Sequence, residues 1–70
     1  MNEILQLLVN GEPREVGVGT TVADLVAALG LKPQQVAVER NKQIVRRPDH
    51  VETFLEDGDE LEVVTFFGGG

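Results

Sequence analysis

Length, composition and charge confine this chain to one small acidic domain. Its 70 residues carry six Lys and Arg against twelve Asp and Glu, a formal net charge of −6, and no cysteine. The acidic balance disfavours nucleic acid and anionic membrane surfaces, because both attract basic proteins. The lack of cysteine excludes disulfides, thiolate nucleophiles and sulfur-ligated metal sites. No signal-peptide pattern or membrane-spanning run is visible, so we expect a cytoplasmic protein.

The first part of the chain predicts a β-hairpin. Residues 4–9 are almost entirely apolar and stop at Asn10-Gly11, a pair typical of two-residue hairpin turns. The returning strand is expected at residues 14–18. We expect Pro13 to limit how far the pairing reaches toward the turn.

A helix is predicted next, and it has start and stop signals. Thr21 is placed to cap it, with Asp24 three residues later at the capping-box spacing. One helical face recurs at i, i+3, i+4 and i+7: Val22, Leu25, Val26 and Leu29. Gly30 is placed to adopt a positive φ just past the end, and Pro33 prevents continuation.

The second half predicts three strands separated by turns. Expected strands are residues 36–40, 43–45 and 60–67, expected turns are 41–42 and 56–59, and 46–50 is a polar connection. Residues 51–55 are predicted as one short helical turn. In the last strand, Glu60 and Glu62 alternate with Leu61 and Val63, which indicates one buried face.

This order predicts an α+β fold of the ubiquitin-like β-grasp type, a mixed sheet of four to five strands around one main helix. The first and last strands are the most apolar, so we expect them side by side and parallel at the centre. The expected core is Leu5, Leu7, Val9, Val16, Val18, Leu25, Val26, Leu29, Val38, Ile44, Leu61 and Val63. Residues 1–67 would form the domain and residues 68–70 a flexible tail.

Catalytic and metal sites find little support in the sequence. His50, the only histidine, lies in a polar stretch and is predicted to be surface, as are Arg46 and Arg47. The glycines at 17, 19 and 30 do not match a phosphate-binding loop. The carboxylates of residues 56–60 surround Gly58 but lack the spacing of a calcium loop, so we expect a solvated turn. The sequence therefore predicts neither a catalytic residue nor a metal or cofactor.

The tail, Gly68, Gly69 and Gly70, is the strongest candidate for function. A frayed end is the ordinary explanation of such a segment. However, the glycines follow an apolar strand with no polar spacer. Glycine has no Cβ, so the tail could enter a narrow channel on another protein. An active site at the end of that channel could then act on the terminal carboxylate. A carboxylate reacts with nucleophiles only after activation, for example as an adenylate.

Several segments form a pattern together: residues 10–12, 21–25, 36–45 and 57–59 and the terminal Gly-Gly. With this pattern the chain resembles the ThiS family, the sulfur carriers of thiamine biosynthesis. Terminal Gly-Gly is common to ubiquitin-like carriers, whereas Glu-Arg-Asn-Lys-Gln-Ile-Val at 39–45 favours ThiS. The chain differs from the family pattern by a few extra N-terminal residues and a third glycine.

The resemblance implies a non-enzymatic co-substrate. A ThiF-type enzyme would adenylate Gly70, a sulfurtransferase would supply sulfur to form a thiocarboxylate, and the thiazole synthase ThiG would take that sulfur. The lack of cysteine agrees, because sulfur could then be carried covalently only at the carboxyl terminus.

The last strand also predicts a surface for such partners. If Leu61 and Val63 face the helix, then Val64 and Phe66 lie on the open face, beside Leu8 or Ile4 of the neighbouring strand. With Phe67, they would form an exposed apolar docking patch next to the tail. The alternative is that the two phenylalanines close the edge of the core.

Three other functions are compatible with the same pattern. The small subunit of molybdopterin synthase shares the fold and the Gly-Gly end, but is usually longer and lacks the Arg-Asn-Lys-Gln-Ile pattern. A ubiquitin-like protein modifier would use the same adenylation chemistry. A plain interaction module with a disordered end would use none of it.

Overall fold

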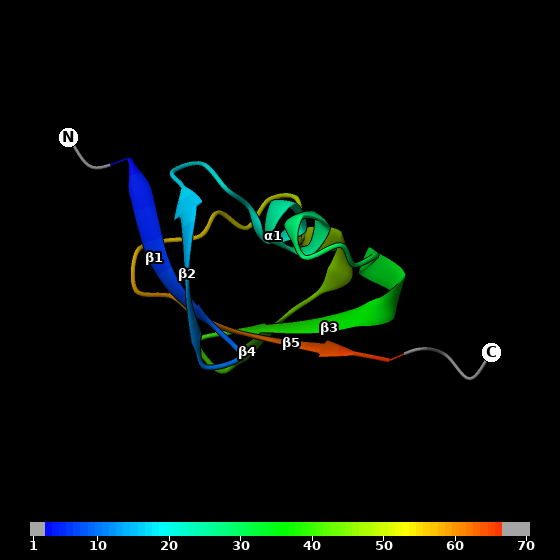
Figure 1. The fold of residues 1–70 in the computed structure, drawn as a ribbon. Helices are drawn as coiled ribbons and strands as arrows, with labels where there is room; N and C mark the ends of the chain where they lie inside the picture. Colours follow the sequence, from blue (N-terminus) through cyan, green and yellow to red (C-terminus); the bar gives the residue numbers. More distant parts are fainter. Residues whose placement is uncertain (1–2, 67–70) are drawn as a thin grey trace.

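The computed structural model describes residues 3–66, which form a sheet with one helix packed on one face (Figure 1). The elements are β1 (Ile4–Val9), β2 (Glu12–Gly17), α1 (Val22–Ala28), β3 (Val36–Arg40), β4 (Gln43–Val45) and β5 (Glu60–Thr65), with short 3-10 turns η1 (Pro33–Gln35) and η2 (Arg47–Asp49). The strand order is β2-β1-β5-β3-β4. β1 and β5 are parallel, and the other neighbours are antiparallel. This arrangement confirms the predicted β-grasp fold.

Both hairpins close through two residues in the left-handed region. The four φ angles are 52° at Asn10, 82° at Gly11, 51° at Asn41 and 71° at Lys42. Positive φ at both central positions matches the right-handed twist of the flanking strands. The turns predicted at these two positions are therefore confirmed.

Pro13 does not limit the first hairpin, contrary to our expectation. The pairing runs past it, with Leu8 opposite Pro13 and Val9 opposite Glu12. β2 is the outermost strand next to β1, so a residue without an N–H is tolerated there.

The helix begins and ends as predicted. Thr21 Oγ1 accepts from the Asp24 N–H at 3.1 Å, and Asp24 Oδ2 accepts from the Thr21 N–H at 3.0 Å, which completes a capping box. At the other end Gly30 has φ 77°, and its N–H donates to the Ala27 carbonyl at 2.9 Å. Gly30 therefore ends the helix in the left-handed conformation expected of it.

The core lies between α1 and the facing side of the sheet. Its buried members are Leu7, Val9, Val22, Leu25, Val26, Val36, Val38, Leu55, Leu61 and Val63. Leu5, Val16 and Leu29 from the predicted core are partly buried against it. The predicted core omits Val22, Val36 and Leu55.

Two predicted core residues, Val18 and Ile44, are exposed. Val18 is 64% exposed because β2 already ends at Gly17. Ile44 is 76% exposed because it lies opposite Glu39, on the face of the sheet that α1 does not cover.

The connection between β4 and β5 also differs from expectation. A helical turn predicted at residues 51–55 is wrong, since the turn is η2, at Arg47–Asp49. Residues 53–55 instead run beside the start of α1: Val22 N–H donates to the Thr53 carbonyl and Leu55 N–H donates to the Thr20 carbonyl, both at 2.9 Å. These bonds hold Leu55, a core residue, beside the start of α1. Within residues 3–66, no helix has the length and hydropathy needed to cross a bilayer.

Candidate functional site

The predicted attachment residue Gly70 lies outside the described residues, as do Gly68, Gly69 and Phe67. The roles predicted for them therefore stay predictions. What the structure describes is the strand that leads to them. β5 ends at Thr65, and the N–H of the next residue, Phe66, donates to the Gln35 carbonyl at 2.9 Å.

The two neighbours of β5 support it over different lengths. β3 pairs with it from Arg40 opposite Leu61 to Val36 opposite Thr65. β1 pairs with it only at Leu8 opposite Glu60 and at Val9 opposite Leu61. The second half of β5 therefore extends beyond β1 while remaining paired with β3.

Val64 and Phe66 lie on the surface, as predicted. Val64 is 57% exposed and Phe66 is 45% exposed. Val64 lies opposite Ala37 of β3, which is also exposed. We call Ala37, Val64 and Phe66 the apolar patch. Exposure alone does not show that it binds a partner, and that role stays a prediction.

The neighbours expected for the apolar patch were wrong. Leu8 is level with Glu60, four residues before Val64, and Ile4 lies at the far end of β1. The parallel register separates the exposed apolar residues of β1 from those at the end of β5. The sequence could not show this, because alternation within a strand says nothing about its offset from a neighbour.

Acidic residues adjoin the apolar patch along the sheet. Glu62 is opposite Glu39 on β3, two pairs along from the Ala37–Val64 pair and therefore on the same face. Glu60 follows on that face and is exposed, like Glu62. The outward side chains of β5 thus change from apolar at its end to acidic at its start, where the exposed Ile44 and Leu8 lie beside Glu39 and Glu60.

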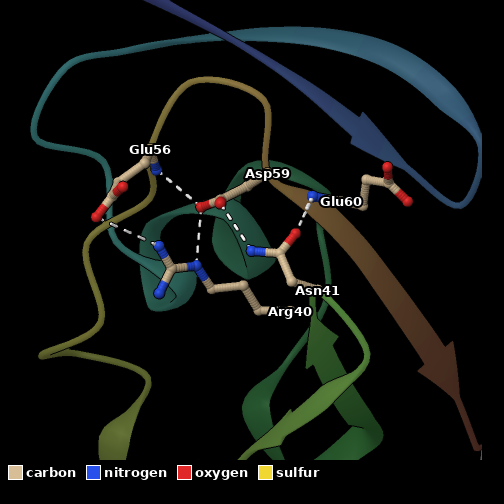
Figure 2. Close-up of polar contacts among 5 residues, drawn as sticks. All are labelled: Arg40, Asn41, Glu56, Asp59 and Glu60. Carbon is tan, nitrogen blue, oxygen red and sulfur yellow. Dashed lines mark hydrogen bonds and ion pairs between the residues drawn. The ribbon is translucent and has the colours of Figure 1, made fainter.

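Asp59, the residue just before β5, is the centre of a polar cluster (Figure 2). One carboxylate oxygen accepts from Arg40 Nε at 2.8 Å and from the Glu56 N–H at 2.8 Å, and the other accepts from Asn41 Nδ2 at 3.0 Å. Asn41 Oδ1 in turn accepts from the Glu60 N–H at 2.9 Å. The cluster ties the turn before β5 to the β3–β4 hairpin.

The prediction of a solvated turn therefore fails at Asp59, which is 5% exposed. Its neighbours Glu56, Asp57 and Glu60 are exposed, as expected. Burial raises the pKa of Asp59, but the hydrogen bonds from Asn41, Glu56 and Arg40 and the charge of Arg40 outweigh it, so the pKa lies below its usual range. The carboxylate stays ionised as the acceptor of this cluster.

His50 is buried, although we expected it on the surface. It is 3% exposed, its Nε2 lies 3.1 Å from the Val45 carbonyl, and its own carbonyl accepts from the Ala23 N–H. Arg46 and Arg47 are exposed, as predicted. Among residues 3–66 there is no grouping of histidine and carboxylate side chains suited to a metal ion. The described residues thus offer a strand end and an exposed patch as the candidate site.

Comparison with known proteins gives a consistent result. A sulfur carrier protein ThiS from Bacillus subtilis is 44% identical over 50 residues, which cover 71% of this chain and 76% of that protein. The crystal structure of a thiamine biosynthesis protein (ThiS) from Geobacter metallireducens superposes with a TM-score of 0.76 at 35% identity, covering 94% of this chain and all of that one.

A longer relative also matches. A thiazole synthase from Magnetococcus marinus is 44% identical over 66 residues, which are 94% of this chain but 20% of that protein. The chain thus spans about a fifth of the length of this curated relative. A family model described as the ThiS family matches residues 7–70. This match covers nearly the whole sequence, and the chain therefore belongs to the ThiS family.

Proposed function

We propose that this protein is a sulfur carrier of thiamine biosynthesis that holds sulfur as a thiocarboxylate on Gly70. The observation that carries the proposal is the extent of the family match, which runs to residue 70 and so includes all three glycines. The lack of cysteine supports it, because no side chain in this sequence offers a thiol that could carry sulfur covalently.

The proposed chemistry takes place in three steps. The Gly70 carboxylate attacks the α-phosphorus of ATP and displaces pyrophosphate, which leaves an acyl adenylate. The terminal persulfide sulfur of a sulfurtransferase then attacks the carbonyl carbon, and AMP leaves, which gives an acyl disulfide. A thiol reductant finally cleaves the S–S bond, which releases the thiocarboxylate and leaves the sulfurtransferase cysteine in a disulfide with that thiol. A carboxylate oxygen is a poor leaving group and AMP a good one, so the adenylate makes the exchange feasible. The carrier supplies the reacting group, and its partners supply catalysis.

Three partners follow from this chemistry: a ThiF-type adenylating enzyme, a sulfurtransferase and a ThiG-type thiazole synthase. The match to a protein named thiazole synthase supports the third, because the ThiS-like segment there is part of a much longer chain. Carrying both parts on one polypeptide would raise their effective concentration for each other.

We assign partner docking to the apolar patch and the adjoining glutamates. Val64 and Phe66 are more exposed than residues of a closed core edge would be. A suitable partner surface is apolar where it meets these residues and basic where it meets Glu39 and Glu62. Phe67, the other predicted docking residue, belongs to the same proposal.

The main test is intact-mass measurement after incubation with a ThiF-type enzyme, ATP, a persulfide-loaded sulfurtransferase and a thiol reductant. Replacing one oxygen by sulfur should add about 16 Da, as expected for chemistry at a single carboxyl group. A sample without ATP is the control, and deletion of Gly69 and Gly70 should abolish the gain.

An unchanged mass, with enzymes that thiolate another ThiS protein in parallel, would contradict the proposal. The measurement also establishes whether Gly70 ends the mature chain, which the chemistry requires. Rescue of a strain that cannot make the thiazole of thiamine, without rescue of one lacking the molybdopterin-synthase small subunit, would separate the two carrier functions.

A further inference from the structure

Asn10 links the first hairpin turn to the last strand. Its side-chain Oδ1 accepts from the Val63 N–H at 2.8 Å, and its Nδ2 donates to the Val63 carbonyl at 3.2 Å. Its backbone N–H donates to the Leu61 carbonyl at 2.9 Å. Asn10 therefore contacts two alternate residues of β5, Leu61 and Val63. Val63 lies 53 positions further along the chain.

The Asn10 amide takes the place of a missing strand residue. The β1–β5 pairing ends at Val9 opposite Leu61, because the chain turns away at Asn10 with φ 52°. A side-chain amide presents one donor and one acceptor as a peptide group does. It therefore satisfies the two backbone groups of Val63 that β1 would have bound had it continued.

Asparagine at position 10 suits both the hairpin turn and the contact with Val63. The turn needs a residue that tolerates positive φ, and asparagine does so more readily than most residues. Glycine would also fit the turn, but it would leave Val63 unpaired on this side. Val63 is 7% exposed with the Asn10 side chain in place, and the Asn10 amide is the partner of both of its backbone groups on this side.

We propose that Asn10 is a positioning residue for the carboxyl-terminal tail. It fixes β5 at Val63, three residues before Phe66, and so holds the strand from which the tail leaves the domain. This rests on the proposed function, in which an enzyme must bring the Gly70 carboxylate into line with ATP. Reaction rates are sensitive to such placement, and a displacement of about 1 Å can cost about 100-fold.

The test compares Asn10→Gly with Asn41→Gly. Both replace an asparagine of similar φ at the first position of a two-residue hairpin turn. Each removes two side-chain hydrogen bonds, but Asn41 bonds to Asp59 and to the Glu60 N–H, at the opposite end of β5. Glycine keeps the turn in both variants, so both should fold. The Asn41 variant therefore controls for a general loss of stability.

Amide hydrogen exchange should show where each variant loosens. We expect exchange of the Val63 N–H to become at least about tenfold faster in Asn10→Gly, and exchange of the Glu60 N–H to accelerate in Asn41→Gly. The isosteric Asn10→Asp keeps the acceptor for the Val63 N–H and loses the donor to its carbonyl, so it should be intermediate.

The rate of carboxylate activation should then separate an effect on the position of the tail from an effect on the stability of the domain. In ATP–pyrophosphate exchange with a ThiF-type enzyme, we expect kcat to fall about tenfold for Asn10→Gly and less than about twofold for Asn41→Gly. KM for the carrier should change by less than about twofold in both, because neither substitution alters a side chain of the apolar patch.

Equal changes in kcat for the two variants, or a change in KM alone, would overturn the positioning role and leave Asn10 as a stabilising residue only. A wild-type protein that supports no exchange would refute the proposed function as well. The two failures are thus distinguishable from the wild-type measurement.

Discussion

Asp59 is the residue whose setting differs most from its sequence context. Read along the chain, it is one of several carboxylates around Gly58, and it is the one among residues 56–60 that is buried. What distinguishes it is a set of donors from Arg40, Asn41 and Glu56. Two of these lie on the β3–β4 hairpin, which meets this turn only in the folded protein.

Stability should therefore depend on the ionisation of Asp59. Its pKa is lower in the folded protein than the ordinary value of 3.8. Between these two values the unfolded chain binds more protons, so the free energy of unfolding falls as the pH decreases through that window. Above it, the stabilising contribution is fully present.

We expect Asp59→Asn to lower the free energy of unfolding by about 2 kcal/mol at pH 7, because the charged acceptor of Arg40 is lost. The difference from wild type should narrow as the pH falls below about 4, where the wild-type carboxylate becomes protonated. Urea unfolding at several pH values measures both effects. A difference that stays constant down to about pH 2 would contradict the role assigned to this ionisation.

At the scale of elements, local signals account for the helix. Its start depends on Thr21 and Asp24, three residues apart, and its end depends on Gly30. Each contact lies within one turn of the chain, so the sequence alone predicts it. The strand limits of β1 and β3 were predicted correctly for the same reason, since both are bounded by turn residues.

We expect Thr21→Ala to lower the free energy of unfolding by about 1 kcal/mol, because the Asp24 N–H at the start of the helix loses its acceptor. For a domain of this size the corresponding fall in Tm is about 4–8 °C. Thermal unfolding followed by circular dichroism measures it. Thr21→Ser keeps the hydroxyl and should retain most of the stability, so equal losses in both variants would argue against the cap.

At the scale of the whole molecule, the two faces of the sheet have different roles. One face packs against α1 and holds the core, whereas the other stays uncovered by the described residues and carries the apolar patch. This division allows changes on the open face to alter binding with little effect on folding, because the side chains there contribute little to the core.

We expect Val64→Ala to weaken binding to a ThiF-type enzyme by about tenfold, as for a residue within a docking patch, and to change stability by less than about 0.5 kcal/mol. Val51→Ala is the matched control, because Val51 is 66% exposed against 57% for Val64 but lies on the β4–β5 connection. Isothermal titration calorimetry and urea unfolding measure the two effects. Equal binding by the two variants would place the docking surface elsewhere.

The sequence by itself determined the order of α1 and the five strands, the two hairpin turns, the helix ends and the fold class. These depend on turn residues, capping residues and alternation, which act over a few residues and can be read in order. It also pointed to the strand end before the glycines and to the exposure of Val64 and Phe66.

Only the tertiary structure decided the offset between β1 and β5, the burial of His50 and Asp59, and the contact of Asn10 with Val63. Each of these depends on which distant segments meet: Asn10 and Val63 are 53 residues apart, and Arg40 and Asp59 are 19 apart. A polar side chain gives the same local signal whether it faces water or a buried partner. Its role is settled when the sheet register brings the complementary group within hydrogen-bond distance.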